Sequence, residues 1–296
     1  MRLLNIFFLI LLCSAFSCQQ KKMEKKENVL TVSILPQKFF IEQIAGDDFH
    51  VNVLIPPGAS PATYEPTPLQ MTKISHSMAY FRIGHIPFEE AWCDKIIESA
   101  GDIKVFDLSG DVKLIKNQGH HHGDHFHEEG IDPHIWSSPK TVEKIVQRLY
   151  LDLVQLKPNN QKKYEANLNI FLGKIRDLDI LATKEFNGEN MKAFMIFHPA
   201  LSYLARDYGL KQIPIEMEGK EPSPAYMQHL VMEAREYNIK TIFIQKQFNK
   251  ENAETLAREI GAKVVAIDPL SENWLMEMEN IIRQLNGNGN VKNSEL

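Results

Sequence analysis

The chain has 296 residues, three cysteines and a formal net charge of −5 at pH 7. No basic patch stands out, which argues against nucleic acid as a partner. Hydrophobic residues make up 44% of the chain, enough for sizeable cores, and the length favours about two domains. Two of the cysteines fall within the first 18 residues, so only Cys93 remains, and one thiol cannot form an internal disulfide.

The first residues have the layout of a bacterial secretory signal, in which one Arg precedes an apolar run over residues 6–12. This run is too short to cross a bilayer as a helix, which needs about 20 residues. The stretch "SAFSC" resembles a lipobox whose Cys18 is lipidated after cleavage. We predict a signal over 1–18, a solvated tether over 19–28 and a lipid-anchored protein outside the cytoplasm, in the periplasm or at the cell surface. An ordinary secretory signal cut nearby is the alternative.

Strand and helix patterns then alternate along the chain. In the first part we predict strands over 29–35, 49–55, 78–84 and 103–108, with helices over 36–47, 67–77 and 87–100. A histidine-rich loop at 119–128 interrupts the alternation. A helical apolar period with a Ser cap at Ser138 predicts the next helix over 138–156, which Pro158 ends.

A second alternating run follows one long amphipathic pattern over 159–186, a helix of roughly 28 residues, more than twice the usual length. Strands are predicted over 192–198, 211–216, 241–245 and 263–268, with helices over 199–209, 223–238, 249–261 and 273–285. The predicted fold class is therefore α/β, with two lobes that are each a mostly parallel sheet flanked by helices, joined by one long rigid helix. The predicted lobes cover 29–158 and 187–286, and a tail covers 287–296.

Polar residues gather at the carboxyl ends of these strands, where open α/β sheets bind their ligands. His198 and Asp268 end predicted strands, His85 follows one, Glu65 lies in the loop after another, and His134 follows the histidine-rich loop. Zinc takes four such imidazole and carboxylate ligands at about 2.0–2.2 Å. Each side chain alone is more commonly structural, so the prediction depends on their convergence between the two lobes.

The loop at 119–128 sets five histidines among glycines and acidic residues, with no apolar period to fix them. We expect an auxiliary loop that collects zinc weakly or passes it into the cleft; a solvated insertion without metal affinity is the alternative. The histidines of this loop are His120, His121, His122, His125 and His127.

The chain has no HExxH, GxSxG or phosphate-binding GxxxxGK[ST] signature of hydrolysis.

Four stretches, "IPPGASPATYEPTP", "DPHIWSSP", "FHPALSYLARDYGL" and "AIDPLSENW", together resemble the zinc-binding cluster A-I solute-binding proteins. These are metal receptors of ABC importers, in a family that also contains manganese-binding lipoproteins. The resemblance covers about residues 28–286 in the right order. It implies two α/β lobes bridged by a rigid helix, Zn²⁺ in the cleft, delivery to an ABC permease in the membrane, and no enzymatic activity. We expect a monomer.

By this resemblance, His134 and His198 match family metal ligands, and Asp268 matches the C-terminal carboxylate ligand. The imidazole at 198 replaces the glutamate of manganese-type members, and nitrogen favours zinc over the harder Mn²⁺, which is the less favoured cargo. The family's first ligand corresponds to Ala62, which cannot coordinate a metal. His85 is our predicted replacement, with an oxygen of Glu65 or a water as the alternative.

Three readings from other classes remain beside the receptor. Three protein ligands and a water compose a catalytic zinc, so a zinc hydrolase with Glu65 as base is one of them. A receptor for haem or cobalamin with an axial histidine is the second, and an adhesive role at the cell surface, which leaves no readable signature, is the third. We favour capture because a site saturated by protein ligands leaves no open position for an activated water.

Overall fold

The computed structural model describes residues 28–101, 103–116, 130–187, 193–216, 222–248 and 250–287, and the backbone of 121–122 and 125–126. The predicted signal, the lipidation site Cys18, and nearly all of the tether and tail lie outside these residues. Among the described residues, no helix is both long enough and apolar enough to cross a membrane.

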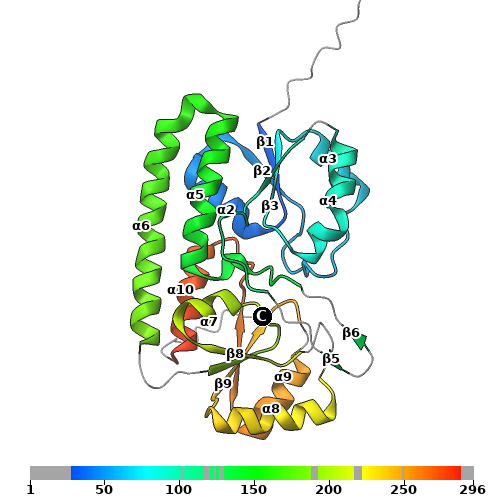
Figure 1. The fold of residues 1–296 in the computed structure, drawn as a ribbon, viewed down its shortest axis with the longest axis vertical. Helices are drawn as coiled ribbons and strands as arrows, with labels where there is room; N and C mark the ends of the chain where they lie inside the picture. The colour runs from blue at the N-terminus through cyan, green and yellow to red at the C-terminus, as the bar shows by residue number, and fades with distance from the viewer. Residues whose placement is uncertain are drawn as a thin grey trace, which may run out of the picture.

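The first lobe is built on a four-stranded parallel sheet in the order β2-β1-β3-β4 (Figure 1). β1 reads VLTV and is buried on both faces, as expected for a central parallel strand. The strands are β1 (Val29–Val32), β2 (His50–Val53), β3 (Ala79–Arg82) and β4 (Lys104–Asp107). The helices are α2 (Leu35–Ala45), α3 (Pro68–Ser75) and α4 (Pro87–Ala100), with the 3-10 turn η1 (Gly46–Asp48) after α2.

The second lobe repeats this plan with a parallel sheet in the order β10-β9-β7-β8. In each lobe the first strand along the chain, β1 or β7, has the second strand on one side and the third strand on the other. This reversal of strand order is a switch point, where α/β proteins bind ligands. The strands are β7 (Ala193–Ile196), β8 (Lys211–Pro214), β9 (Thr241–Gln245) and β10 (Lys263–Ile267). The helices are α7 (Ser202–Tyr208), α8 (Pro224–Glu236), α9 (Glu251–Ile260) and α10 (Trp274–Leu285).

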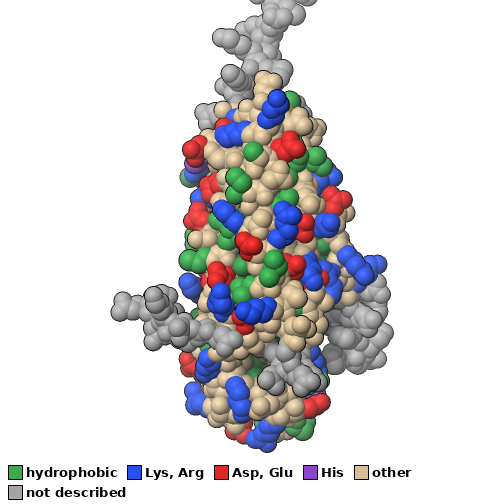
Figure 2. Space-filling view, turned by 90° about the vertical axis from the view of Figure 1, so that its left-hand side faces the viewer, with side chains coloured by type: hydrophobic (Ala, Val, Ile, Leu, Met, Phe, Trp, Pro, Cys, Tyr) green, Lys and Arg blue, Asp and Glu red, His purple; other side chains and the backbone are tan. Residues whose placement is uncertain are grey.

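A pair of long helices connects the lobes, α5 (Pro139–Leu156) and α6 (Gln161–Phe186), separated by the 3-10 turn η3 (Pro158–Asn160). α6 has 26 residues and runs beside both lobes along one edge of the molecule (Figure 1). Its buried side chains recur every three or four positions, which gives it one apolar stripe. Its outer face mixes charges of both signs with isolated apolar side chains (Figure 2).

One hydrophobic core continues from the first lobe into the second. Phe171 of α6 packs against Phe40 of α2, with ring centroids 6.0 Å apart, and Phe40 in turn meets Trp274 of α10 edge-on at 5.3 Å. A smaller core lies within the second lobe alone. The larger core therefore joins side chains of both lobes and of α6.

The predicted fold class is confirmed, down to the order of the strands and helices. Two local expectations differ. Ser138 stands at the N-cap of α5, but its hydroxyl donates to Asp207 Oδ2 at 2.6 Å instead of bonding the helix. The backbone of the histidine-rich stretch forms a short antiparallel pair, β5 (His121–His122) with β6 (His125–Phe126), where no strand was predicted.

Candidate metal-binding site

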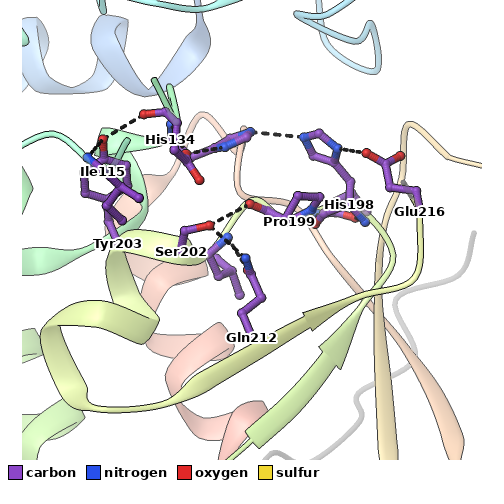
Figure 3. Close-up of polar contacts among 11 residues, drawn as sticks. Ile115, His134, His198, Pro199, Ser202, Tyr203, Gln212 and Glu216 are labelled. Carbon is purple, nitrogen blue, oxygen red and sulfur yellow. Dashed lines mark hydrogen bonds and ion pairs between the residues drawn. The ribbon is translucent and has the colours of Figure 1, made fainter. Parts of the chain in front are cut away.

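Two histidines from different lobes face each other between the two sheets. Nε2 of His134 lies 3.2 Å from Nε2 of His198, and the ring planes meet at 71° (Figure 3). His134 precedes the 3-10 turn η2 (Ile135–Ser137), which leads into α5. His198 lies just beyond the carboxyl end of β7, where a ligand residue of an α/β sheet is expected.

Asp132 orients the first of these rings. Its Oδ1 accepts the backbone N–H of His134 at 2.9 Å and lies 2.9 Å from Nδ1 of the same residue. Burial tends to raise the pKa of Asp132, but the hydrogen bond and charge of His134 outweigh it, so this pKa is lowered. Burial also lowers the pKa of His134, against the opposing effect of Asp132. The lowered pKa of His134 favours the neutral imidazole, the form that binds metals.

Glu216 orients the second ring from the end of the neighbouring strand β8. Its Oε1 lies 2.5 Å from Nδ1 of His198. The amide of Gln245 fixes the backbone of this histidine, because it accepts His198 N–H at 3.3 Å and donates to His198 O at 2.6 Å. Phe248 stacks on the ring at 5.0 Å. The ring is thus held at its backbone, at Nδ1 and on one face.

The two carboxylates decide what the facing nitrogens can do. A carboxylate at Nδ1 favours the tautomer with the proton on Nδ1, which leaves a lone pair on Nε2. Two such lone pairs 3.2 Å apart repel unless a proton or a metal cation lies between them. A proton makes the contact a hydrogen bond, whereas a metal takes both nitrogens as ligands. Two zinc–nitrogen bonds of about 2.0–2.1 Å at a tetrahedral angle place their nitrogens about 3.3 Å apart. The spacing of this pair therefore fits a small tetrahedral ion.

Asp268 follows β10 at the boundary of the lobes. Its Oδ1 accepts the backbone N–H of Leu270 at 3.3 Å, and its own N–H donates to Glu277 at 2.9 Å. It lines a cavity of about 180 Å³ to which both lobes contribute residues. From the first lobe this cavity receives the start of α2 and the loop 55–58 after β2.

The other predicted ligands lie on the first lobe. His85 follows β3 with a left-handed backbone (φ 63°), which is strained for a residue with a Cβ, and its side chain is half-buried. Glu65 and Ala62 are exposed in the loop after β2. In the part of the chain that the structure describes, no three His, Cys, Asp or Glu side chains are grouped to hold one ion. The structure thus brings His134 and His198 together and leaves the remaining ligands as predictions.

The histidines of the auxiliary loop lie outside the residues whose side chains are described. Sequence reasoning missed Asp132 and Glu216, which hold the two rings. Glu216 ends the predicted strand 211–216, so the criterion that selected His198 and Asp268 also applied to it. Asp132 stands two residues before His134, a spacing at which an Asp side chain readily accepts a backbone N–H.

Two parallel-sheet lobes bridged by one long helix, with an imidazole pair between them, define the class of helix-bridged solute-binding proteins. Residues 30–287 match the family model described as ZnuA, zinc-uptake complex component A, periplasmic. The chain belongs to this family, as its sequence motifs predicted.

Two relatives illustrate the similarity. The chain is 32% identical over 274 residues to the high-affinity zinc uptake system protein ZnuA of Bacillus subtilis, covering 89% of this chain and 85% of that protein. It is 30% identical over 296 residues to the zinc-binding lipoprotein AdcA of Streptococcus pneumoniae strain R6. That alignment covers 93% of this chain but 58% of AdcA, so the chain spans little more than half of this relative's length.

Solved structures agree with the fold. A crystal structure of ZnuA superposes with a TM-score of 0.81 at 35% identity, covering 88% of this chain and 98% of that one. The metal-dependent lipoprotein YcdH of Bacillus subtilis gives a TM-score of 0.69 at 30% identity, covering 87% and 95%. These similarities confirm the predicted two-lobed architecture with its bridging helix.

Proposed function

We propose that this chain is an extracytoplasmic receptor that binds Zn²⁺ between its lobes and delivers it to an ABC permease. The observation that carries the proposal is the facing pair of Nε2 atoms on His134 and His198, 3.2 Å apart and each backed by a carboxylate. Membership of the zinc-uptake family supports it, as do relatives named for zinc uptake and zinc binding.

Zinc is the favoured cargo because both facing donors are imidazole nitrogens. Mn²⁺ prefers oxygen ligands and is the less favoured cargo. Asp132 and Glu216 add two buried negative charges behind the imidazoles, each only 5% exposed. These charges lie close enough to offset those of a bound dication without occupying its coordination positions.

Asp268 and His85 complete the proposed ligand set. Asp268 lies at the lobe boundary on a cavity that the first lobe also lines, and it is the proposed carboxylate ligand because it matches the C-terminal ligand position of the family. His85 would take the position that Ala62 leaves empty. Glu65 or a water is the alternative for that fourth position.

A zinc hydrolase is not supported. Such an enzyme requires a general base beside the metal, and Glu65, the candidate for that role, is exposed in its loop. The relatives are named as components of zinc uptake. A closed set of protein ligands suits capture and release of an ion better than activation of water.

Lipidation at Cys18, a monomeric state and the predicted lobe boundaries belong to the same proposal. The auxiliary loop at 119–128 is proposed to collect zinc weakly and pass it to the cleft. Deleting this loop should leave one tight zinc site and remove weaker ones. Loss of the tight site in that deletion would contradict the proposed division of roles.

The decisive test is a zinc titration against a competing chelator. We expect His134→Ala and His198→Ala each to abolish the tight site. His229→Ala is the matched control, because His229 lies on α8 with 60% of its side chain exposed. Wild-type affinity in either site variant would overturn the proposal. The same titration on His85→Ala tests the fourth ligand, which an unchanged Kd would eliminate.

A further inference from the structure

The segment that carries His134 is tied to the second lobe by a buried tyrosine. Tyr203 lies on α7, a few residues after His198, and is fully buried. Its hydroxyl donates to Asp132 O at 2.7 Å and accepts the backbone N–H of Ile115 at 3.2 Å. One phenol therefore joins the helix that follows one histidine to the residue that orients the other (Figure 3).

Two indoles tie the same segment to the loop that follows Asp268. Trp136 Nε1 donates to Pro269 O at 3.0 Å, and Trp274 Nε1 donates back to Trp136 O at 2.8 Å. Both rings are buried. Because the two bonds run in opposite directions across one contact, they resist sliding between the two segments as well as separation.

The spacing that these bonds control has little tolerance. With zinc–nitrogen bonds of about 2.0–2.1 Å, two imidazoles more than about 4.1 Å apart cannot bind one zinc ion even in a straight line. The observed separation is 3.2 Å, so a relative shift of about 1 Å between the segments would break the pair. The segments come from different lobes, so sequence proximity cannot hold this distance.

We propose that Tyr203, Trp136 and Trp274 are positioning residues that set metal selectivity by fixing His134 relative to His198 and Asp268. The inference rests on the proposed function, since it concerns the same ion site. The bonds of these three residues reach the backbone of the ligand segments, not the facing imidazole nitrogens. A rigid spacing suits a small tetrahedral ion with imidazole ligands, and a loosened one admits ions with longer bonds and other geometries.

Tyr203→Phe is the sharpest variant, because it removes one hydroxyl and keeps the buried ring. Tyr164→Phe is its matched control: Tyr164 is also fully buried, but its hydroxyl bonds to Asn160 beside α6. Zinc and manganese Kd values are measured by chelator competition, and ligand geometry by the visible spectrum of bound Co²⁺. Thermal unfolding of both variants measures the common cost of losing a buried hydroxyl.

We expect Tyr203→Phe to weaken zinc binding about tenfold, because the variant loses the buried hydrogen bonds of one hydroxyl group. Its preference for zinc over manganese should narrow and its Co²⁺ spectrum should change. Tyr164→Phe should keep the wild-type Kd and spectrum at a similar Tm. Trp274→Phe is a second variant, with the half-buried Trp92→Phe on α4 as its control.

Wild-type zinc affinity, selectivity and Co²⁺ spectrum in Tyr203→Phe and Trp274→Phe would overturn the proposal. An equal loss of zinc affinity in Tyr164→Phe would also overturn it, since the loss would then follow from lower stability of the whole chain and not from the position of Tyr203. Failure of the unmodified chain to bind zinc would overturn the proposed function itself. This failure can be distinguished from failure of the positioning proposal, because it is measured on the unmodified chain and not on a variant.

Discussion

Glu216 lies 2.5 Å from Nδ1 of His198, and Asp132 lies 2.9 Å from Nδ1 of His134. The two imidazoles are therefore held in the same way, although one carboxylate is two residues from its histidine and the other is 18 residues away. This matching leaves both Nε2 atoms free to act together on one ion. It also means that the strength of the site depends on residues that do not coordinate the metal.

Removing one of these carboxylates should weaken zinc binding without removing a ligand. We expect Glu216→Ala to raise the zinc Kd by about 10- to 100-fold, and Glu216→Gln to raise it less, because Gln keeps an acceptor oxygen and loses the charge. Glu233→Ala is the control, since Glu233 of α8 pairs with Lys211 and His229, neither of which is a predicted ligand. An unchanged Kd in Glu216→Ala would show that His198 needs no orienting carboxylate.

Glu89 of α4 makes stability depend on pH. Its carboxylate is 1% exposed and accepts backbone N–H groups from Ile83 at 2.8 Å and Gly84 at 2.7 Å, as well as the hydroxyl of Ser33. Burial is the largest influence and raises its pKa from 4.5 to about 7, although these hydrogen bonds oppose the shift. Between these two values the folded chain holds a proton that the unfolded chain has lost.

The sign of the effect follows from that proton. The contribution of Glu89 to stability is fully present below pH 4.5 and declines as the pH rises through about 7, by an amount of up to about 3 kcal/mol. Glu89→Gln should therefore flatten the change in Tm between pH 5 and pH 8. Glu98→Gln, an exposed change on the same helix, should leave the slope as in wild type. Equal slopes in all three proteins would refute the assignment.

The bridging helix offers a test of the core with neighbouring residues. Phe171 is 1% exposed and packs against Phe39 and Phe40, whereas Ile170 is 63% exposed on the outer face of α6. We expect Phe171→Ala to lower the free energy of unfolding by about 3–5 kcal/mol. Ile170→Ala should change it by less than about 0.5 kcal/mol. Urea unfolding measures both, and similar losses would contradict the assigned orientation of the helix.

Helices with clear end signals were predicted from the sequence most closely. The predicted helix 87–100 matches α4 at both ends, because a Pro stands at its first turn and Gly101 follows its last. The predicted helix 199–209 begins later, at Ser202. Its first residues instead form a turn in which Leu201 N–H donates to Gln212 of β8 at 2.8 Å, a contact between distant segments that local patterning does not reveal.

The histidines of the site could be predicted one by one, but their arrangement could not. His134 and His198 are 64 residues apart, and their spacing depends on Tyr203 and on the packing of two lobes. A position at the end of a strand identifies side chains that are suited to bind a metal. It does not give the distances between those side chains in the folded chain. The ligand that replaces the family histidine at Ala62 stays a prediction for the same reason.

The base of the histidine-rich stretch is closed by an antiparallel bridge between Lys116 and Ile131 and by Asp132 N–H donating to Ile115 O at 2.9 Å. Tyr203 bonds both sides of this neck. Because this neck fixes the two ends of the stretch, changing the length of chain between them costs little stability. Residues 117–129 are therefore a natural graft position, where an unrelated peptide or fluorescent reporter could be inserted without disturbing the tight site, at the expense of the weak zinc collection proposed for the loop.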